Sequence, residues 1–334
     1  MTSLVVQTAF LGDVVLTTPL LAALAAQHGP VDVVTTPGAA ALLETHPAVR
    51  RVIRYDKRGS DRGLRGLLRL ARALAAERYE AAYLPHRSLR TAALAWLARV
   101  PKRVGFDDGW RWLYTEARRR PREGHEVDRL LALVDTVPGR TSATLHLTPA
   151  DRQAAEDFLC AHAIAAPFVA LAPGSIWGSK RWPSYPELAA RLAERAAIVV
   201  VGGPEDAGLA AEVVAAVARV GGRAVSGCGR LTLRQSADVI RRAIVLVTND
   251  SAPLHFAQAV ATPTVAIFGS TVPAFGFAPR GPRDAVVELA GLACRPCSAH
   301  GPATCPLGHH RCMKSLSVED VLRAVEATGA LVRR

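Results

Sequence analysis

The chain has 334 residues, of which 41 are Lys or Arg and 29 are Asp or Glu, so its formal net charge is +12. This length suffices for two ordinary domains, and a composition that is 50% hydrophobic but only 5% aromatic is typical of helices packed on parallel sheets. No window approaches about 18 uncharged apolar residues, and residues 1–7 lack a basic segment. We therefore expect a cytoplasmic protein with neither a membrane span nor a secretory signal.

Short apolar runs alternate with Ala- and Leu-rich runs in the first part of the chain. We predict strands at residues 3–9, 31–35, 49–55 and 81–85, and helices at residues 14–27, 63–76 and 89–99. Such alternation is typical of βαβ units, whose strands form a parallel sheet. The first series is expected to end at a linker near Pro138-Gly139.

A second series of the same kind follows. Its predicted strands are residues 168–171, 197–202, 223–226, 244–248 and 264–268, and its predicted helices are residues 151–161, 185–195, 205–219, 233–242 and 251–260. The predicted fold class is therefore α/β, with two doubly wound, Rossmann-like domains at residues 1–150 and 151–334 that face each other across a cleft. Ligands of such sheets bind beyond the carboxyl ends of the strands, so the residues that follow the strands are the candidates for function.

Phe10-Leu-Gly-Asp13 follows the first predicted strand and leads into the first helix. Gly12 permits a tight turn, and Asp13 stands at or near the N-cap of the helix. Either Asp13 only caps the helix, or its carboxylate acts as a general base on a sugar hydroxyl. The sequence leaves both interpretations open.

The loop that follows the strand at residues 168–171 is predicted to bind phosphate. Gly174, Ser175 and Gly178 precede Lys180 in this loop. Glycines let the backbone take conformations that other residues resist, and backbone N–H groups with a cation bind a diphosphate well. Lys180 alone would be read as a surface lysine; in this loop we favour a role in neutralising a departing diphosphate.

A second strand end, Val247-Thr-Asn-Asp-Ser-Ala-Pro-Leu-His255, runs directly into a helix, whose N-terminus attracts anions. Ser251 is expected to cap this helix, and Asp250, which would repel phosphate, is expected to face sugar hydroxyls. Gly202-Gly203 forms a further turn that could line the nucleotide. The candidate donor-binding residues are Gly174, Ser175, Lys180, Gly202, Gly203, Asp250, Ser251, Ala252, Pro253, Leu254 and His255. Together the two strand ends indicate a nucleotide-sugar enzyme.

Basic charge is concentrated between residues 50 and 122, which hold 20 Lys and Arg against 7 Asp and Glu. This indicates an anionic partner, which could be nucleic acid, a membrane surface or a phosphorylated substrate, although a solvated surface also fits. Arginines spaced by four and three residues would line one face of a helix if that helix extends back to residue 58. The predicted acceptor-binding residues are Arg58, Arg62, Arg65, Arg69, Arg72 and Arg87.

A C-x2-C-x7-C-x6-C pattern is formed by Cys294, Cys297, Cys305 and Cys312. The first pair has the spacing of a structural zinc site, but the second pair lacks it. A structural metal, reduced packing cysteines and a redox role therefore stay open, and disulfides are disfavoured in a reducing compartment. Cys160 and Cys228 are expected to be core residues.

Over nearly its whole length the chain resembles the ADP-heptose:lipopolysaccharide heptosyltransferases of glycosyltransferase family nine. The motifs that carry this resemblance are Phe10-Leu-Gly-Asp13 with Thr18-Pro19, His46-Pro47, Arg103-Val-Gly-Phe106, His125-Glu-Val-Asp-Arg129, Pro173-Gly-Ser-Ile-Trp-Gly-Ser-Lys-Arg-Trp-Pro183, Gly202-Gly203, and Thr248-Asn-Asp-Ser251 with His255. Cys305-Pro-Leu-Gly-His-His-Arg-Cys312 is most similar to the heptosyltransferase II branch. Ala252 departs from the family pattern, which usually has Gly, and its Cβ restricts close backbone approach.

The resemblance implies a GT-B fold that binds the acceptor on the first domain and the donor on the second. It implies an inverting, metal-independent transfer of heptose from ADP-heptose to the inner core of lipopolysaccharide, with no cofactor required. Asp13 would deprotonate the acceptor hydroxyl, and Lys180 would stabilise the leaving ADP. Asp250, Ser251 and the amides of residues 252–254 would hold the donor, and the arginine helix would receive phosphates of the lipid-linked acceptor at the inner membrane.

Two alternatives remain. Another GT-B enzyme, with a different donor or acceptor or acting as a nucleotide-sugar 2-epimerase, would share these motifs. A basic, zinc-bearing nucleic-acid-binding protein would explain the arginines and cysteines but not the two phosphate-binding turns. Because only Tyr79 and Tyr83 lie near the arginines, the basic region lacks the interleaved aromatic residues of such proteins, and no nucleic-acid partner is expected.

Overall fold

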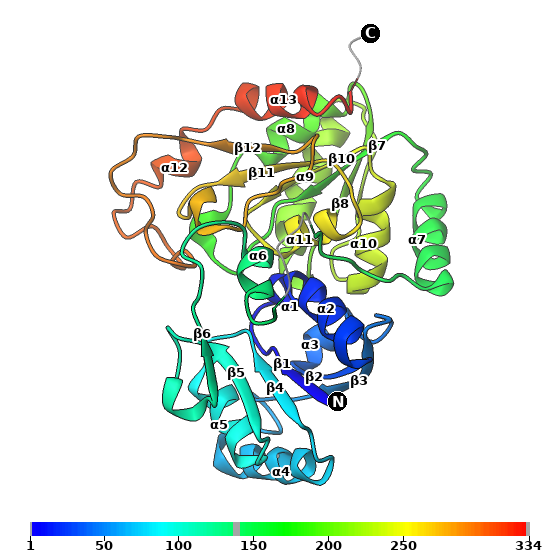
Figure 1. Cartoon of the computed structure of the whole chain (residues 1–334). Coiled ribbons are helices and arrows are strands. Elements are labelled where there is room, and N and C mark those ends of the chain that lie inside the picture. Colours follow the sequence, from blue (N-terminus) through cyan, green and yellow to red (C-terminus); the bar gives the residue numbers. More distant parts are fainter. Residues whose placement is uncertain (1, 136–140, 332–334) are drawn as a thin grey trace. The chain divides into compact units, whose positions relative to one another are not determined.

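The computed structural model describes residues 2–135 and 141–331, which divide into two units, Met1–His146 and Leu147–Arg334 (Figure 1). The division predicted between residues 150 and 151 would cut the first turn of α7 (Pro149–Ala161). The predicted linker at Pro138-Gly139 lies outside the described residues. Within the described ranges, the helices are all too short or too polar to cross a bilayer.

The first unit is built on a parallel sheet with the strand order β3-β2-β1-β4-β5-β6. Its strands are β1 (Ser3–Val6), β2 (Val31–Thr35), β3 (Val49–Arg54), β4 (Ala81–Leu84), β5 (Lys102–Phe106) and β6 (Glu116–Arg118). Its helices are α1 (Leu11–Leu16), α2 (Thr18–His28), α3 (Pro37–Ala40), α4 (Gly63–Ala76), α5 (Leu89–Leu97) and α6 (Glu126–Leu131), with a 3₁₀ turn at Arg111–Leu113.

The second unit repeats this plan, with a parallel sheet in the order β12-β11-β10-β7-β8-β9. Its strands are β7 (Phe168–Ala172), β8 (Ala197–Val200), β9 (Ala224–Ser226), β10 (Val245–Asn249), β11 (Thr264–Phe268) and β12 (Ala285–Glu288). Besides α7, its helices are α8 (Tyr185–Leu192), α9 (Ala207–Arg219), α10 (Leu233–Arg242), α11 (Ala252–Ala259), α12 (Arg311–Lys314) and α13 (Val318–Ala327).

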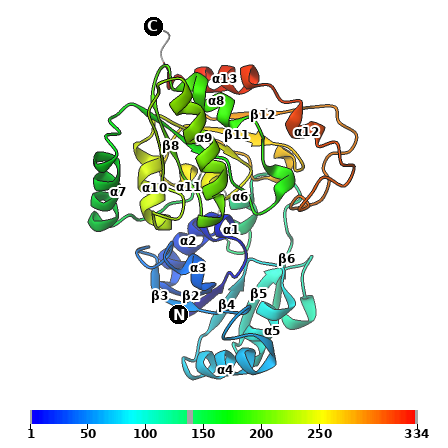
Figure 2. The ribbon, with the colours of Figure 1, turned by 180° about the vertical axis from the view of Figure 1, so that it is seen from behind.

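The four inner strands of the second sheet, β7, β8, β10 and β11, are buried on both faces, which explains why they read as continuous apolar runs. Val169 and Leu171 point to the face covered by α8, α9 and α13, and Figure 2 shows α8 and α9 over this face. Phe268 points to the opposite face, where Leu254 of α11 packs against it. Successive side chains of a strand point in opposite directions, so both faces need apolar residues.

The helix predicted at residues 14–27 is in fact two helices, α1 and α2, which meet at Thr17. Pro19 causes the break, because it has no N–H and its ring would clash with the carbonyl of residue 15 in a continuous helix. The hydroxyl of Thr18 donates instead to the carbonyl of Val15 over 2.8 Å.

Three strands were not predicted from the sequence, namely β5, β6 and β12. β6 and β12 are the edge strands of their sheets, and β6 has only three residues, two of them charged. Edge strands are commonly short and charged, which hides them from a search for apolar runs. β5 begins with Lys102 and Arg103 and contains Gly105, so it too lacks such a run.

Each sheet has one point at which the strand order reverses, between β1 and β4 in the first unit and between β7 and β10 in the second. Helices leave the two neighbouring strands there in opposite directions and open a crevice at the carboxyl edge. The segments that follow β1, β7 and β10 carry Asp13, Lys180 and Asp250. The topology therefore places the predicted residues at the ligand-binding edge of each sheet.

Part of the basic charge of the first unit is structural. Asp32 is fully buried in β2, and its carboxylate accepts hydrogen bonds from Arg50 (2.8 Å) and Arg51 (2.9 Å) and from the Tyr79 hydroxyl. Burial by itself raises the pKa of Asp32, but the hydrogen bonds from Arg50 and Tyr79 outweigh it and lower that pKa below its ordinary value. These contacts tie β3 and the end of α4 to the middle of the sheet.

Replacing Asp32 should destabilise the first unit, because the substitution leaves two arginines and a buried hydroxyl without their acceptor. For Asp32→Ala we expect the free energy of unfolding in urea to fall by about 2 kcal/mol, less than for a fully enclosed pair since both guanidinium groups reach solvent. Asp135→Ala is the control, because the Asp135 carboxylate is 82% exposed. If both variants unfold at the wild-type urea concentration, the Asp32 network does not stabilise the fold.

Candidate functional site

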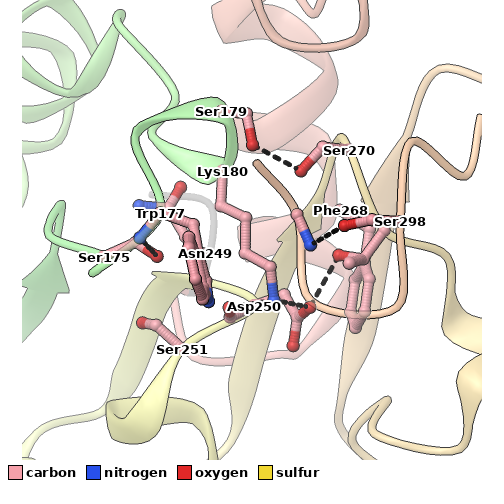
Figure 3. A network of polar contacts seen from close by, with 12 residues as sticks. Ser175, Trp177, Ser179, Lys180, Asn249, Asp250, Ser251, Phe268, Ser270 and Ser298 are labelled. Atoms are coloured by element: carbon pink, nitrogen blue, oxygen red, sulfur yellow. Dashed lines mark hydrogen bonds and ion pairs between the residues drawn. The ribbon is translucent and has the colours of Figure 1, made fainter. Parts of the chain in front are cut away.

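Lys180 is a buried residue, which excludes the interpretation as an ordinary surface lysine. It ends the short turn Gly178–Lys180 after β7 and is 8% exposed. Its Nζ lies 2.6 Å from Oδ2 of Asp250 and 3.2 Å from the Asp250 carbonyl oxygen (Figure 3). The Thr271 hydroxyl donates to the same Oδ2 over 2.6 Å. The two predicted strand ends are thus joined by an ion pair, with Thr271 as a third partner that the sequence did not indicate.

Asn249, the last residue of β10, fixes the lysine-bearing loop to the sheet. Its side-chain amide donates to the carbonyl of Pro173 over 2.8 Å, and its Oδ1 accepts from the backbone N–H of Trp182 over 3.2 Å. The loop before and after Lys180 is therefore hydrogen-bonded to one side chain. Ser175 contributes within the loop, where its carbonyl accepts from Nε of Arg181 over 2.9 Å.

The N-terminus of α11 offers fewer free amides than expected. Ser251 occupies the N-cap position, but its side chain makes no capping hydrogen bond. Pro253 has no N–H, and the Leu254 N–H donates to the Ser251 carbonyl over 3.1 Å. Of the three amides predicted to bind a diphosphate, the Ala252 N–H is therefore the one left to do so. The Leu254 side chain belongs to the core.

His255 is 5% exposed, and its Nδ1 is buried without a hydrogen-bond partner. The ring lies edge-on to Phe277, with 6.1 Å between the ring centres. Burial lowers the pKa of His255 to about 4; Asp250 opposes this shift and Lys180 reinforces it. The imidazole is therefore neutral at pH 7, next to the ion pair.

Gly174 and Gly202 both lie against the side chain of Asp206. A Cβ built on Gly174 would lie 2.2 Å from Cγ of Asp206, and one on Gly202 would lie 2.7 Å from its Oδ2. The Asp206 carboxylate accepts from the Gly203 N–H over 3.0 Å. Burial raises the pKa of Asp206. The ends of β7 and β8 thus close around one carboxyl group that the sequence analysis did not single out.

In the first unit, Asp13 lies in the first turn of α1 rather than in a turn before the helix or at its N-cap. Phe10 is the N-cap residue, and its backbone N–H donates to Oδ2 of Asp13 over 3.1 Å. Asp13 therefore does contribute to capping, as the simpler interpretation held. That contact occupies one carboxylate oxygen, and the side chain as a whole is half-buried.

The pKa of Asp13 is raised to about 6, first by burial and next by the charge of Glu126. Glu126 is itself buried and accepts two hydrogen bonds from Arg120, of 2.6 and 2.8 Å. The hydrogen bond from Phe10 and the charge of Arg120 lower the pKa of Asp13 and limit the shift. Glu126 and Arg120 follow Asp13 by more than a hundred residues, so no local spacing could have connected them to it.

The line of arginines along one helix face is shorter than predicted. α4 begins at Gly63, so Arg62 is its N-cap residue and Arg58 lies in the preceding turn. Arg69 pairs with Asp61. Exposed Arg65 and Arg72 remain on the helix, where Leu64 is also 66% exposed.

Two basic residues follow strands at the carboxyl edge of the first sheet. Arg87 comes after β4, and its exposed guanidinium lies 3.4 Å from Asp108. Lys57, which the sequence analysis did not select, comes after β3 and donates to the Thr8 carbonyl over 2.6 Å. Its position beside the end of β1 follows from the strand order β3-β2-β1 and could be recognised only once that order was known.

A structural metal at the four cysteines of the pattern stays a prediction. In the part of the chain that the structure describes, no group of three or more His, Cys, Asp or Glu side chains is arranged to hold a metal ion. Cys312 is buried and the other three cysteines of the pattern are half-buried, all as free thiols. Burial and the neighbouring thiols raise the pKa values of Cys297 and Cys312. Cys160, expected in the core, is exposed, whereas Cys228 is buried as expected.

A model of glycosyltransferase family 9 (heptosyltransferase) matches residues 67–306. The chain belongs to this glycosyltransferase family. It is 27% identical over 297 residues to lipooligosaccharide heptosyltransferase 2 of Haemophilus influenzae, which covers 82% of this chain and 85% of that protein. The chain is also 31% identical to lipooligosaccharide heptosyltransferase 2 of Campylobacter jejuni over 163 residues. This match covers 47% of this chain and 49% of that protein, so here the chain spans about half the length of its relative.

Solved structures agree with the fold. A family 9 glycosyltransferase from Veillonella parvula has a TM-score of 0.84 at 24% identity, with 98% of this chain and 96% of that chain covered. The Escherichia coli ADP-heptose lps heptosyltransferase II has a TM-score of 0.80 at 23% identity, with 98% of each chain covered. The predicted fold class, α/β with two Rossmann-like units of the GT-B type, is confirmed.

Neutral, buried His255 predicts a dependence of stability on pH. An unfolded histidine binds a proton below about pH 6.5, whereas folded His255 does so only below about pH 4. The contribution of neutral His255 to the free energy of unfolding is therefore fully present above the unfolded pKa. It declines as the pH falls, by about 2 kcal/mol between pH 7.5 and pH 5. Urea denaturation at both pH values should show that His255→Gln loses less stability than wild type on acidification. An equal loss in both proteins would mean that His255 is protonated in the folded state.

Proposed function

We propose that this glycosyltransferase is an inverting heptosyltransferase that transfers heptose from ADP-heptose to the inner core of lipopolysaccharide. The observation that carries the proposal is the buried Lys180–Asp250 pair, at the point where the strand order of the second sheet reverses. A cation and a carboxylate fixed together at a helix N-terminus suit a ligand that has both a diphosphate and sugar hydroxyls. The family and the names of its heptosyltransferase 2 relatives support the choice of sugar.

The second unit would bind the donor through Lys180 and the start of α11. An ammonium group has three donors, and Asp250 takes two of them, through its side chain and its carbonyl. The third is available to a diphosphate oxygen, as is the Ala252 N–H. Asp250, which carries a negative charge, would accept from heptose hydroxyls instead. Lys180 thereby supplies a positive charge to the leaving ADP, and the proposed reaction needs no metal for that purpose.

The first unit would supply the base. As the acceptor oxygen forms its bond to the anomeric carbon and the bond to the ADP oxygen breaks, the hydroxyl proton would pass to the Asp13 carboxylate. A base with a pKa of about 6 is largely ionised at pH 7 and still has appreciable affinity for a proton. Burial and Glu126 set this value, so the surroundings of Asp13 suit the task better than an exposed carboxylate would.

The acceptor is proposed to lie over the basic part of the first unit. Arg62, Arg65, Arg72 and Arg87 are exposed, and three of them are at or near the carboxyl edge of the sheet, since α4 starts there. Arg72 lies about 15 Å further along the helix, as follows from a rise of about 1.5 Å per residue. Phosphates carried by the acceptor would therefore be bound by the arginines at the start of the helix rather than by Arg72 near its end.

The first unit would also make the contact with the membrane that holds the lipid-linked acceptor. Trp96 of α5 is 53% exposed and Trp112 is 72% exposed, and α5 lies next to the turn that carries Trp112. Exposed tryptophans with surrounding arginines are typical of proteins that bind the surface of an anionic bilayer. No observation favours an epimerase or a nucleic-acid-binding protein over the transferase.

Substitution of Asp13 and Lys180 separates their proposed roles. Asp13→Asn should lower kcat for heptose transfer by roughly 100- to 10,000-fold and leave the Kd for ADP unchanged. The kcat of the wild type should fall as the pH drops below about 6, because Asp13 then becomes protonated. Lys180→Ala should weaken ADP binding by roughly 10-fold or more, because a charge-assisted contact is lost. Isothermal titration with ADP and a transfer assay with ADP-heptose give both values. Lys314→Ala, an exposed lysine of the same unit, is the control.

Membrane contact is tested by sedimentation with vesicles. Wild type should sediment with vesicles that contain phosphatidylglycerol, less so with neutral vesicles, and less at high salt because of screening. The double variant Trp96→Ala, Trp112→Ala should remain largely in the supernatant. Ile176→Ala, which removes a side chain that is 70% exposed on the second unit, should sediment like wild type. Equal sedimentation of all three proteins would remove the tryptophans from the contact.

A further inference from the structure

The segment at residues 294–312 carries four of the six cysteines, and its backbone lies against the turn that holds Lys180. The Pro302 carbonyl accepts from the Ser179 hydroxyl over 2.6 Å and from the Ser179 N–H over 3.4 Å. The same hydroxyl lies 3.0 Å from the Ser270 hydroxyl (Figure 3). The residue that precedes Lys180 is therefore held by this segment on one side and by the end of β11 on the other.

His310 adds a contact from the far end of the segment. Its Nε2 lies 2.9 Å from the carbonyl oxygen of Ser179. Because a carbonyl can only accept, the ring must donate through Nε2. Ser179 thus has its N–H, hydroxyl and carbonyl all bound by residues more than 90 positions away in the sequence.

Gly301 lies beside the lysine side chain, at a position where a side chain would meet it. A Cβ on Gly301 would lie 3.2 Å from Cε of Lys180, 3.2 Å from Oγ of Ser179 and 2.7 Å from Oγ of Ser270. The φ of Gly301 is +83°, a conformation that favours glycine. A methyl group at this position would therefore collide with Ser270 and press on Lys180 and Ser179.

The beginning of the segment is anchored to the sheet. The guanidinium of Arg295 donates to the carbonyls of Leu289 (2.6 Å) and Thr271 (2.9 Å) and pairs with Glu288 at 2.7 Å. The Cys297 N–H donates to the Ser270 carbonyl over 2.9 Å. These bonds join the segment to the ends of β11 and β12, next to Thr271, the third partner of the ion pair.

We infer that residues 294–312 act as a clamp that positions Lys180 for the donor diphosphate, with His310 and Gly301 as its positioning residues. The inference rests on the proposed function of Lys180. A lysine has four rotatable side-chain bonds, and holding it in one arrangement before the donor binds removes an entropic cost from binding. The ion pair with Asp250 fixes the ammonium group, and the clamp fixes the stem and the backbone behind it.

Two glycines of the segment provide a matched test. Gly301 and Gly308 both have positive φ, +83° and +70°, so alanine strains the backbone at either position. A Cβ on Gly308 meets nothing within 4 Å, whereas one on Gly301 presses on Lys180. We expect Gly301→Ala to raise the Kd for ADP by roughly tenfold relative to Gly308→Ala, because small displacements of a binding group are costly. Because the added methyl group of Gly301→Ala also meets Ser270, its melting temperature should be the lower of the two, and ADP binding is compared at a temperature at which both variants are folded.

His310 supplies a second, independent variant. His310→Asn keeps a residue that accepts positive φ, which His310 needs at +49°, but its side chain is too short to reach the Ser179 carbonyl. It should weaken ADP binding in the same direction, and His309→Asn should not.

Isothermal titration with ADP on the whole protein decides between the outcomes. Weaker binding by Gly301→Ala and His310→Asn, with wild-type binding by Gly308→Ala and His309→Asn, supports the clamp. Equal ADP affinity for Gly301→Ala and Gly308→Ala overturns it while the proposed function stands. If wild type itself does not bind ADP, the proposed donor site is wrong and the clamp falls with it.

Discussion

The site of the second unit depends on one buried ion pair, Lys180 with Asp250. Taking two charges out of water is costly, and the cost is offset only when geometry is good and the remaining polar atoms have partners. Here Thr271 binds the carboxylate, and the Asp250 carbonyl accepts from the ammonium group. Removing Lys180 or Asp250 would leave the other charge buried without its ion-pair partner. Much of the surrounding structure can be understood as keeping these two groups together.

Three separate chain segments serve that purpose. Asn249 ties the loop after β7 to β10, the segment at residues 294–312 holds Ser179, and Thr271 brings in the end of β11. The first unit uses the same strand order for a different chemistry, since its carboxyl edge carries a carboxylate whose pKa is raised by burial and by Glu126. One topology thus presents a fixed cation in one unit and a carboxylate with a raised pKa in the other.

The sequence predicted most strands that are buried on both faces, and it predicted α4 and α10 with the bounds that the structure has. It also selected Asp13, Lys180 and Asp250, because each lies in the segment that follows a strand. It missed Glu126, Thr271 and Asp206, which reach the same places from distant segments or carry no local signature. The line of arginines was predicted to be longer than it is, because that prediction assumed a helix extending back to residue 58, whereas α4 starts at Gly63 with Arg62 at its N-cap.

The closure of β7 and β8 around Asp206 constrains how this part of the sequence can change. Gly174 and Gly202 belong to different strand ends, yet the carboxyl group of one residue fills the space of both missing side chains. A methyl group at either position would have to displace the Asp206 side chain. Substitutions at positions 174, 202 and 206 are therefore expected to affect one another, although the three residues are far apart in the sequence.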